Sequence, residues 1–390
     1  MTAFNRRNFL RTTGVGILPA LIPFTPAWAN ELQKDQSSPP ASPIVKFFGD
    51  GEMFEPEDYL AELQKAHAAT AIVRDRYGVG GVVEALEKKF AALTGKEKSI
   101  YMPTGTMANQ LAIAVLSGEN TKIFVQDTSH IYRDEADAAQ SVHNKRLMPL
   151  AKNETYFTAQ QLQSAIENLN NEEVFKSGVG AVAIECPVRR TDGRVVPIDE
   201  IKNISTYCRT NKIGFHLDGA RIFMASAWTG IPVKEYASYF DTVYISLYKY
   251  FGAGAGAVLS GPAAIIDKMA HLIKIHGGSM YSNWSNAAMV LYRMEGFETR
   301  MQNAIKASNE IFTALNKMGI QVKPLDGGTN IYSLELAKEV DGKKMQATLN
   351  KDFNIRMPRP NEKNQSMISV NETLLYQPAD YIINAFKKSI

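Results

Sequence analysis

The segment Ile213-Gly214-Phe215-His216-Leu217-Asp218-Gly219-Ala220-Arg221 leads from an apolar strand pattern into a carboxylate, a turn and a guanidinium. Similar short apolar runs alternate with helical patterns on both sides of it. Strand patterns occupy Ser99–Met102, Lys122–Gln126, Ala181–Glu185, Thr242–Leu247 and Ala257–Ser260, and helical patterns occupy Met107–Leu116 and Ile198–Thr210. This alternation predicts an α/β fold with a mostly parallel sheet sandwiched by helices. Because ligands bind beyond the carboxyl ends of such strands, we look for chemistry at those ends.

The pattern changes after about residue 285. A long helical stretch runs from Asn286 towards Met318, followed by strand patterns at Asn330–Leu336 and Met367–Val370 and a final helix after Pro378. We therefore predict a large domain over residues 44–285 and a smaller α+β domain over residues 286–390.

Composition excludes several classes of protein. The 390 residues are 45% hydrophobic and 21% charged, so the chain can bury a sizeable core and is not disordered or collagen-like. Lys and Arg number 43 against 40 acidic residues, and the excess is Arg6, Arg7 and Arg11. The remainder is neutral, which gives no reason to expect nucleic acid or an acidic membrane as partner. Cys186 and Cys208 allow at most one disulfide, whose presence stays open, and no metal-ligand set is expected.

Residues 1–29 have the layout of a secretory signal. Arg6-Arg7 precede a short apolar stretch, and Ala27-Trp28-Ala29 provides a small-x-small cleavage site before Asn30. The paired arginines resemble a twin-arginine export signal, although Asn5 stands where Ser or Thr is usual. This predicts a periplasmic protein handled by the twin-arginine machinery, with a Sec signal or an uncleaved anchor as alternatives. Residues 30–43 read as a flexible linker.

Two candidate elements follow the first strands. Pro103-Thr104-Gly105-Thr106-Met107 leads from a strand into a helix, where backbone N–H groups and the Thr106 hydroxyl suit a phosphate, although many such turns are only helix caps. His130 follows the strand Lys122–Gln126 and could stack on a flat cofactor ring or move protons. A histidine in a surface loop is the alternative.

Two further elements follow later strands. Asp218 at a strand end needs a partner, and a protonated pyridine nitrogen would serve. Arg221 could reach the ring oxygen or a substrate carboxylate, unless the two form a structural pair. Lys249 lies in an apolar segment beside Gly252 and Gly254, which suits an amine that forms a Schiff base with an aldehyde and equally suits a lysine that extends its amine to the surface.

Together the four elements describe a pyridoxal phosphate site. A phosphate turn, a ring-stacking histidine, a carboxylate for a ring nitrogen and a lysine for an aldehyde each follow a strand. The sequence therefore predicts pyridoxal 5′-phosphate as the cofactor.

The order of these motifs resembles the threonine aldolase and β-eliminating lyase family of fold type I pyridoxal-phosphate enzymes. The resemblance covers roughly Tyr77 to Ser282, and its most specific pieces are Thr104–Gln110 and His216–Arg221. It implies a homodimer or homotetramer acting on a small amino acid.

The resemblance also implies a role for each site residue. Gly105 and Thr106 are expected to bind the phosphate, and His130 is expected to stack on the ring. Asp218 is expected to pair with the ring nitrogen. Arg221 is expected to contact the cofactor or the substrate, and Lys249 is expected to form the Schiff base. Lys274 is expected to lie near the phosphate. Of these, Lys249, His130, Asp218 and Arg221 are the expected catalytic residues.

The departures from the family pattern concern the substrate. A Glu-x-Thr-His stretch becomes Glu185-Cys186-Pro187-Val188, which loses a histidine that could act on a β-hydroxyl. A Ser-Asp pair becomes Gly49-Asp50, and the residue before Lys249 is Tyr248 instead of serine. Gly277–Ser282 loses an arginine, and the late-strand carboxylate arginine has only Arg356 and Arg359 as nearby candidates.

We therefore predict a threonine-aldolase-like lyase that cleaves a β-hydroxy-α-amino acid to glycine and an aldehyde. The alternatives are β-elimination, transamination, racemisation or tailoring of an exported metabolite. A non-catalytic exported binding module is the alternative of a different class.

Overall fold

The computed structural model describes residues 43–390. The predicted signal peptide, and all of the predicted linker except Pro43, lie outside the described residues. Within residues 43–390, no helix is both long and apolar enough to cross a membrane.

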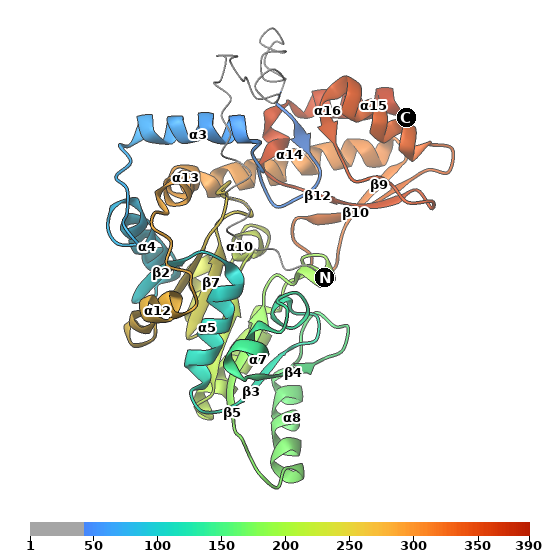
Figure 1. The fold of residues 1–390 in the computed structure, drawn as a ribbon. Coiled ribbons are helices and arrows are strands. Elements are labelled where there is room, and N and C mark those ends of the chain that lie inside the picture. Colours follow the sequence, from blue (N-terminus) through green and yellow to red (C-terminus); the bar gives the residue numbers. More distant parts are fainter. Residues whose placement is uncertain (1–42) are drawn as a thin grey trace, which may run out of the picture. The chain divides into compact units, whose positions relative to one another are not determined.

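A seven-stranded sheet forms the centre of the fold (Figure 1). Its strands, in the spatial order β2-β8-β7-β6-β5-β3-β4, are β2 (Lys98–Met102), β3 (Lys122–Gln126), β4 (Arg146–Leu150), β5 (Val179–Glu185), β6 (Gly214–Asp218), β7 (Thr242–Ser246) and β8 (Ala257–Gly261). β8 runs antiparallel to both of its neighbours, and the other neighbouring strands are parallel. This confirms the predicted mostly parallel sheet.

Helices cover both faces of the sheet. One core contains side chains of α4 (Gly81–Thr94), α8 (Ala159–Glu172), α9 (Ile198–Thr210), α10 (Ile222–Thr229) and α11 (Val233–Ser238). The opposite face packs against α5 (Gly105–Ser117), α7 (Ala138–His143) and α12 (Ala263–Ile275). β5 shows the two-residue period of a doubly covered strand, because Val182 and Ile184 join the first core and Ala181 and Ala183 face the second.

The carboxyl ends of the strands position the candidate site. β2 ends at Met102, and the side chain of Thr104 caps α5 by accepting a hydrogen bond from the Met107 N–H at 3.2 Å. The short helix α6 (His130–Arg133) begins four residues after β3. Asp218 is the last residue of β6, so it lies at the same edge of the sheet.

The C-terminal part contains an antiparallel sheet with the order β12-β10-β9, formed by β9 (Ile320–Pro324), β10 (Ile331–Leu336) and β12 (Gln365–Ser369). Helices α14 (Phe297–Lys317), α15 (Gly342–Phe353) and α16 (Ala379–Ser389) share a core with it. The short strand β1 (Val45–Lys46) pairs with β11 (Ile355–Arg356), and Val45 and Phe47 join this core. The division into domains at residue 285 stays a prediction.

The helical stretch expected from Asn286 towards Met318 is interrupted. It consists of α13 (Trp284–Met294) and α14, separated at Gly296. Gly296 has a φ of 67°, a left-handed conformation that glycine adopts readily and that a continuous helix excludes. The remaining elements are α3 (Pro56–Ala69) and the 3₁₀ helices η1 (Arg189–Thr191) and η2 (Glu372–Tyr376).

Candidate active site

A cavity of about 220 Å³ lies where the strand ends meet the start of α5. Its walls come from the predicted phosphate turn, from His130 and from the segment around Lys249. The lining residues are Pro103, Thr104, Gly105, Thr106, His130, Tyr244, Tyr248, Gly254, Ala255 and Gly256. Elements more than a hundred residues apart in the sequence thus meet at one cavity, as the sequence predicted for three of its four motifs.

The first turn of α5 provides an anion site. The N–H groups of Gly105 and Thr106 have no hydrogen-bond acceptor among the described residues. A Cβ atom on Gly105 would lie 2.1 Å from the Oη atom of Tyr244, so only glycine fits against this tyrosine. Burial raises the pKa of Tyr244 well above its ordinary value, which keeps the phenol protonated. Free N–H groups at a helix N-terminus are suited to a phosphate.

Asp218 is buried without a cationic partner among the described residues. It lies in register between Glu185 on β5 and Tyr244 on β7. Its Oδ2 atom accepts a hydrogen bond from Nδ2 of Asn109 at 3.1 Å, and Oδ1 accepts one from the N–H of Ala220 at 3.2 Å. A buried carboxylate with only neutral partners is costly, so the site favours a cationic ligand here. A protonated pyridine nitrogen fits this requirement.

Asn109 connects Asp218 to residues that the sequence did not single out. Its Nδ2 atom also donates to Oε1 of Glu135 at 2.8 Å. Its Oδ1 atom lies 3.0 Å from Nε2 of His216, whose Nδ1 atom lies 2.8 Å from the Thr242 hydroxyl. Burial lowers the pKa of His216 to about 4, so the imidazole is neutral at physiological pH.

Two further buried carboxyl groups surround Asp218. The pKa of Glu135 is raised to about 8 and that of Glu185 to about 7, in both cases first by burial and then by repulsion from Asp218. Both residues were missed at the sequence level. Asn109 and His216 stand inside the motifs Thr104–Gln110 and His216–Arg221, which could have indicated them, whereas no local pattern marks Glu135.

His130 is held from two sides. Its backbone N–H donates to Oε2 of Glu185 at 2.8 Å, and its ring Nδ1 atom lies 3.2 Å from Oδ2 of Asp134. Asp134 in turn accepts from Nε of Arg190 at 3.0 Å, and this hydrogen bond is the main reason that the pKa of Asp134 is lowered. The charged carboxylate of Asp134 therefore orients the ring of His130, which lines the cavity.

Neither Arg221 nor Lys249 lines the cavity, although Lys249 directly follows the lining residue Tyr248. Nε of Arg221 donates to Oδ2 of Asp50 at 2.8 Å, so the unusual Gly49-Asp50 pair reaches the site. Lys249 is half-buried, and its Nζ atom lies 3.5 Å from the hydroxyl of Tyr248. A Cβ atom on Gly51 would lie 2.8 Å from Cα of Tyr250, which shows how closely residues 49–52 pack beside the lysine segment.

Other candidate residues lie apart from the cavity. Lys274 is exposed near the end of α12, with Nζ 5.6 Å from the centre of the Tyr77 ring, and its place near the phosphate stays a prediction. Arg356 and Arg359 are exposed and do not line it either. Cys186 and Cys208 are free and buried, and burial raises the pKa of each thiol to about 12, so both thiols are protonated at neutral pH.

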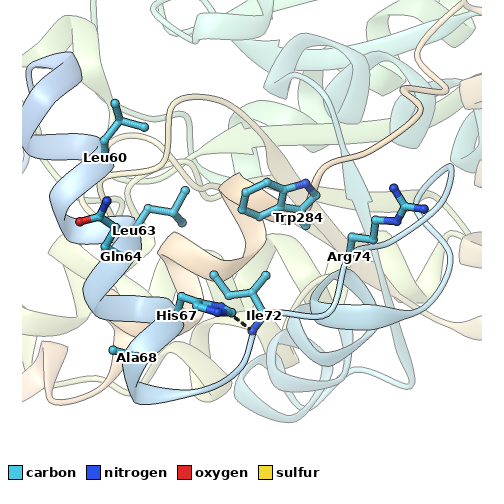
Figure 2. A pocket seen from close by; sticks show the side chains of 8 residues that line it. All are labelled: Leu60, Leu63, Gln64, His67, Ala68, Ile72, Arg74 and Trp284. Atoms are coloured by element: carbon cyan, nitrogen blue, oxygen red, sulfur yellow. Dashed lines mark hydrogen bonds between the residues drawn. The ribbon is translucent and has the colours of Figure 1, made fainter.

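A larger cavity, of about 730 Å³, lies beside α3 (Figure 2). Its lining is mostly apolar, and it includes His67, whose Nδ1 atom accepts from the N–H of Ile72 at 3.1 Å, and Trp284. None of the predicted site residues lines it. The predicted site residues that line a described cavity therefore line the smaller one.

The fold and the site together define a fold type I enzyme whose residues fit pyridoxal phosphate. Residues 60–337 match the family model described as beta-eliminating lyase, so the chain belongs to this family. This confirms the predicted family, a pyridoxal-phosphate-dependent lyase, and its cofactor.

Individual comparisons agree with the family. The chain is 29% identical over 276 residues to a low-specificity L-threonine aldolase of Candida albicans, covering 70% of this chain and 72% of the relative. It is 32% identical over 196 residues to the alanine racemase TOXG of Cochliobolus carbonum, covering 50% and 49%.

A solved structure from Exiguobacterium sp. 255-15, assigned as an aromatic amino acid beta-eliminating lyase/threonine aldolase, superposes with a TM-score of 0.73. The match covers 89% of this chain and 96% of that one at 24% identity. A likeness at this identity supports the fold alone, and it confirms the predicted fold class.

Proposed function

We propose that the chain is an exported lyase that cleaves a β-hydroxy-α-amino acid to glycine and an aldehyde. The observation that carries the proposal is the single cavity at which the start of α5, His130 and the segment before Lys249 meet, with Asp218 buried nearby. The similarity of the chain to a low-specificity L-threonine aldolase of Candida albicans supports the same reaction.

Several residues in and beside the cavity would hold the cofactor. The N–H groups of Gly105 and Thr106 would bind the phosphate, and Asp218 would pair with the ring nitrogen. Lys249 would hold the cofactor through its aldehyde group. When bound, pyridoxal phosphate supplies an electron sink for the bond that breaks at the substrate's α-carbon.

His130 is the residue that takes the proton from the substrate's β-hydroxyl. With its Nδ1–H donated to Asp134, the Nε2 atom is left as the acceptor for that proton. Asp134 then stabilises the imidazolium that forms. This assignment replaces the family histidine that is lost at Glu185-Cys186-Pro187-Val188.

The role of His130 can be tested by replacing it with Asn. We expect His130→Asn to lower kcat on L-threonine by about 100-fold or more, with glycine and acetaldehyde still formed in equal amounts. Glu84→Gln, an exposed change on α4, is the matched control and should retain wild-type kcat. Unchanged kcat in His130→Asn would remove it from the mechanism.

Racemisation is the second candidate reaction, because an alanine racemase is among the relatives. In a racemase, Lys249 would remove the α-proton and no carbon–carbon bond would break. The products separate the possibilities: glycine plus an aldehyde for cleavage, a keto acid plus ammonia for elimination, a keto acid plus an aminated cofactor for transamination, and an inverted amino acid for racemisation. A protein that binds amino acids and forms none of these would be a binding module.

Export by the twin-arginine route and assembly into a homodimer or homotetramer complete the proposal. Arg6-Arg7 before an apolar stretch supports the export step. We expect the protein in the periplasmic fraction of a bacterial host, and Arg6→Lys/Arg7→Lys to retain it in the cytoplasm. Export of that variant at the wild-type level would contradict the twin-arginine assignment.

A further inference from the structure

A buried polar cluster lies behind Asp218 and takes no part in the proposed proton transfer. Asn109 is fully buried at its centre. The two hydrogens of its amide go to two different carboxyl groups, Glu135 at 2.8 Å and Asp218 at 3.1 Å. Its oxygen faces the neutral His216, which fixes the orientation of the amide.

The cluster brings two carboxyl groups together without a cation. The bonded oxygen atoms of Glu135 and Asp218 can be no farther apart than the sum of those two hydrogen bonds. Neither carboxyl group forms an ion pair with any of the described residues, and both are at most 5% exposed. Two negative charges this close in a buried site repel each other strongly, so ionisation of one opposes ionisation of the other.

We propose that Glu135 is a positioning residue that acts on Asp218 through Asn109, and that its protonation makes cofactor affinity depend on pH. The inference rests on the proposed cofactor site and adds a residue that no motif indicated.

The groups that face Glu135 support this role. Charged or titratable neighbours come from three strands, Asp218 on β6, Glu185 on β5 and Tyr244 on β7, and α5 contributes only the neutral Asn109 and Thr106. Burial, followed by repulsion from Asp218, raises the pKa of Glu135 to about 8. The proton therefore resides on Glu135 at neutral pH and leaves it in the alkaline range.

The direction of the effect follows from the charge of the ligand. A protonated ring nitrogen beside Asp218 attracts a second negative charge on Glu135. Affinity of the wild-type protein should therefore rise above pH 8, relative to a variant that cannot ionise at this position.

The test uses 4-deoxypyridoxine 5′-phosphate, which has the ring nitrogen and the phosphate but no aldehyde. Lys249 then contributes no covalent step to the measured affinity. Dissociation constants are measured by calorimetry between pH 6.5 and 9.5 for the wild type, Glu135→Gln and Glu135→Asp. Glu87→Gln is the matched control, because burial also raises the pKa of Glu87 to about 7 but its carboxylate accepts from the N–H of Tyr101 and not from Asn109.

We expect the dissociation constant of Glu135→Gln, divided by that of the wild type, to rise about threefold to tenfold across this range with a midpoint near pH 8. Glu135→Asp should restore a pH-dependent step, and Glu87→Gln should follow the wild type. A ratio that stays constant with pH, in a folded Glu135→Gln, would overturn the inference. Failure of the wild type to bind the probe at any pH would instead contradict the cofactor site itself.

Discussion

In the proposed site, Asp218 pairs with the ring nitrogen of the cofactor, because it is buried and all its hydrogen-bond donors are neutral. Replacing it by Asn keeps the shape but removes the charge opposite the ring nitrogen. We expect Asp218→Asn to lower kcat/KM by about 100-fold or more and to weaken binding of pyridoxal phosphate. Steady-state kinetics with a fluorescence titration of the cofactor measure both effects. Wild-type kcat/KM in this variant would show that the ring nitrogen lies elsewhere.

Glu135 should also affect stability. Its pKa is about 8 in the folded protein and near 4.5 when unfolded, so between these values the folded state binds more protons and stability falls as pH rises. In Glu135→Gln this decrease in stability with pH is absent, because glutamine does not ionise. We expect the variant, without cofactor, to gain stability over the wild type on the order of a few kcal/mol between pH 5 and pH 8. Urea unfolding at pH 5 and pH 8 measures the free energy of unfolding of both proteins. An equal change of this free energy with pH in the wild type and in Glu135→Gln would contradict the prediction.

These residues also show where sequence reasoning stops. Asp218 and Lys249 could be singled out because a charged residue after an apolar strand is unusual in the local pattern. Glu135 could not, because its role arises only when α5 and β6 bring Asn109 and Asp218 against it. The sequence named Asp50 only as a departure from the family pattern, and its hydrogen bond with Arg221 appears only in the fold.

Among the helices and strands, the start of α5 is the proposed phosphate site. A methyl group on Gly105 would overlap the Tyr244 hydroxyl and force the turn away from the cavity. We expect Gly105→Ala to weaken binding of pyridoxal phosphate at least about tenfold, since one lost anion contact in a dry site is worth roughly 1.5–3 kcal/mol. Glu84→Gln, an exposed change on α4, is the control and should bind the cofactor as the wild type does. Equal affinity in the wild type and Gly105→Ala would place the phosphate elsewhere.

Most of the central elements followed from hydrophobic periodicity. The predicted strand Lys122–Gln126 and helix Ile198–Thr210 agree with β3 and α9 to the residue. The sequence did not indicate β4, whose Arg146–Leu150 stretch is only partly buried at the edge of the sheet and contains Pro149, a residue that is unusual inside a strand. The reversal of β8 was equally hidden, because strand direction depends on the connection and leaves no periodic signal.

Across the whole chain, a buried ionic cluster links segments far apart in sequence. Glu372 of η2 accepts from Arg293 of α13 and from Nε of Arg300 of α14 at 3.0 Å, and Arg293 also donates to Glu62 of α3. Removing one charge from such a cluster leaves the others uncompensated. We expect Glu372→Gln to lower the free energy of unfolding by about 3 kcal/mol or more.

The exposed pair of Glu84 and Lys88 gives the comparison, since Glu84→Gln should cost less than about 0.5 kcal/mol. Both values come from urea denaturation at neutral pH. Equal effects of the two substitutions would mean that the buried cluster adds little to the stability of the fold.

The visible absorption spectrum of the purified protein with pyridoxal phosphate, before and after addition of L-threonine, tests the assignment most directly. We expect a yellow wild-type protein that changes its spectrum with threonine and releases glycine and acetaldehyde, and a Lys249→Ala variant that lacks both the bound colour and the turnover. A yellow protein indifferent to threonine would retain the cofactor and contradict the proposed substrate. A wild-type protein that stays colourless, or full turnover in Lys249→Ala, would contradict the site itself.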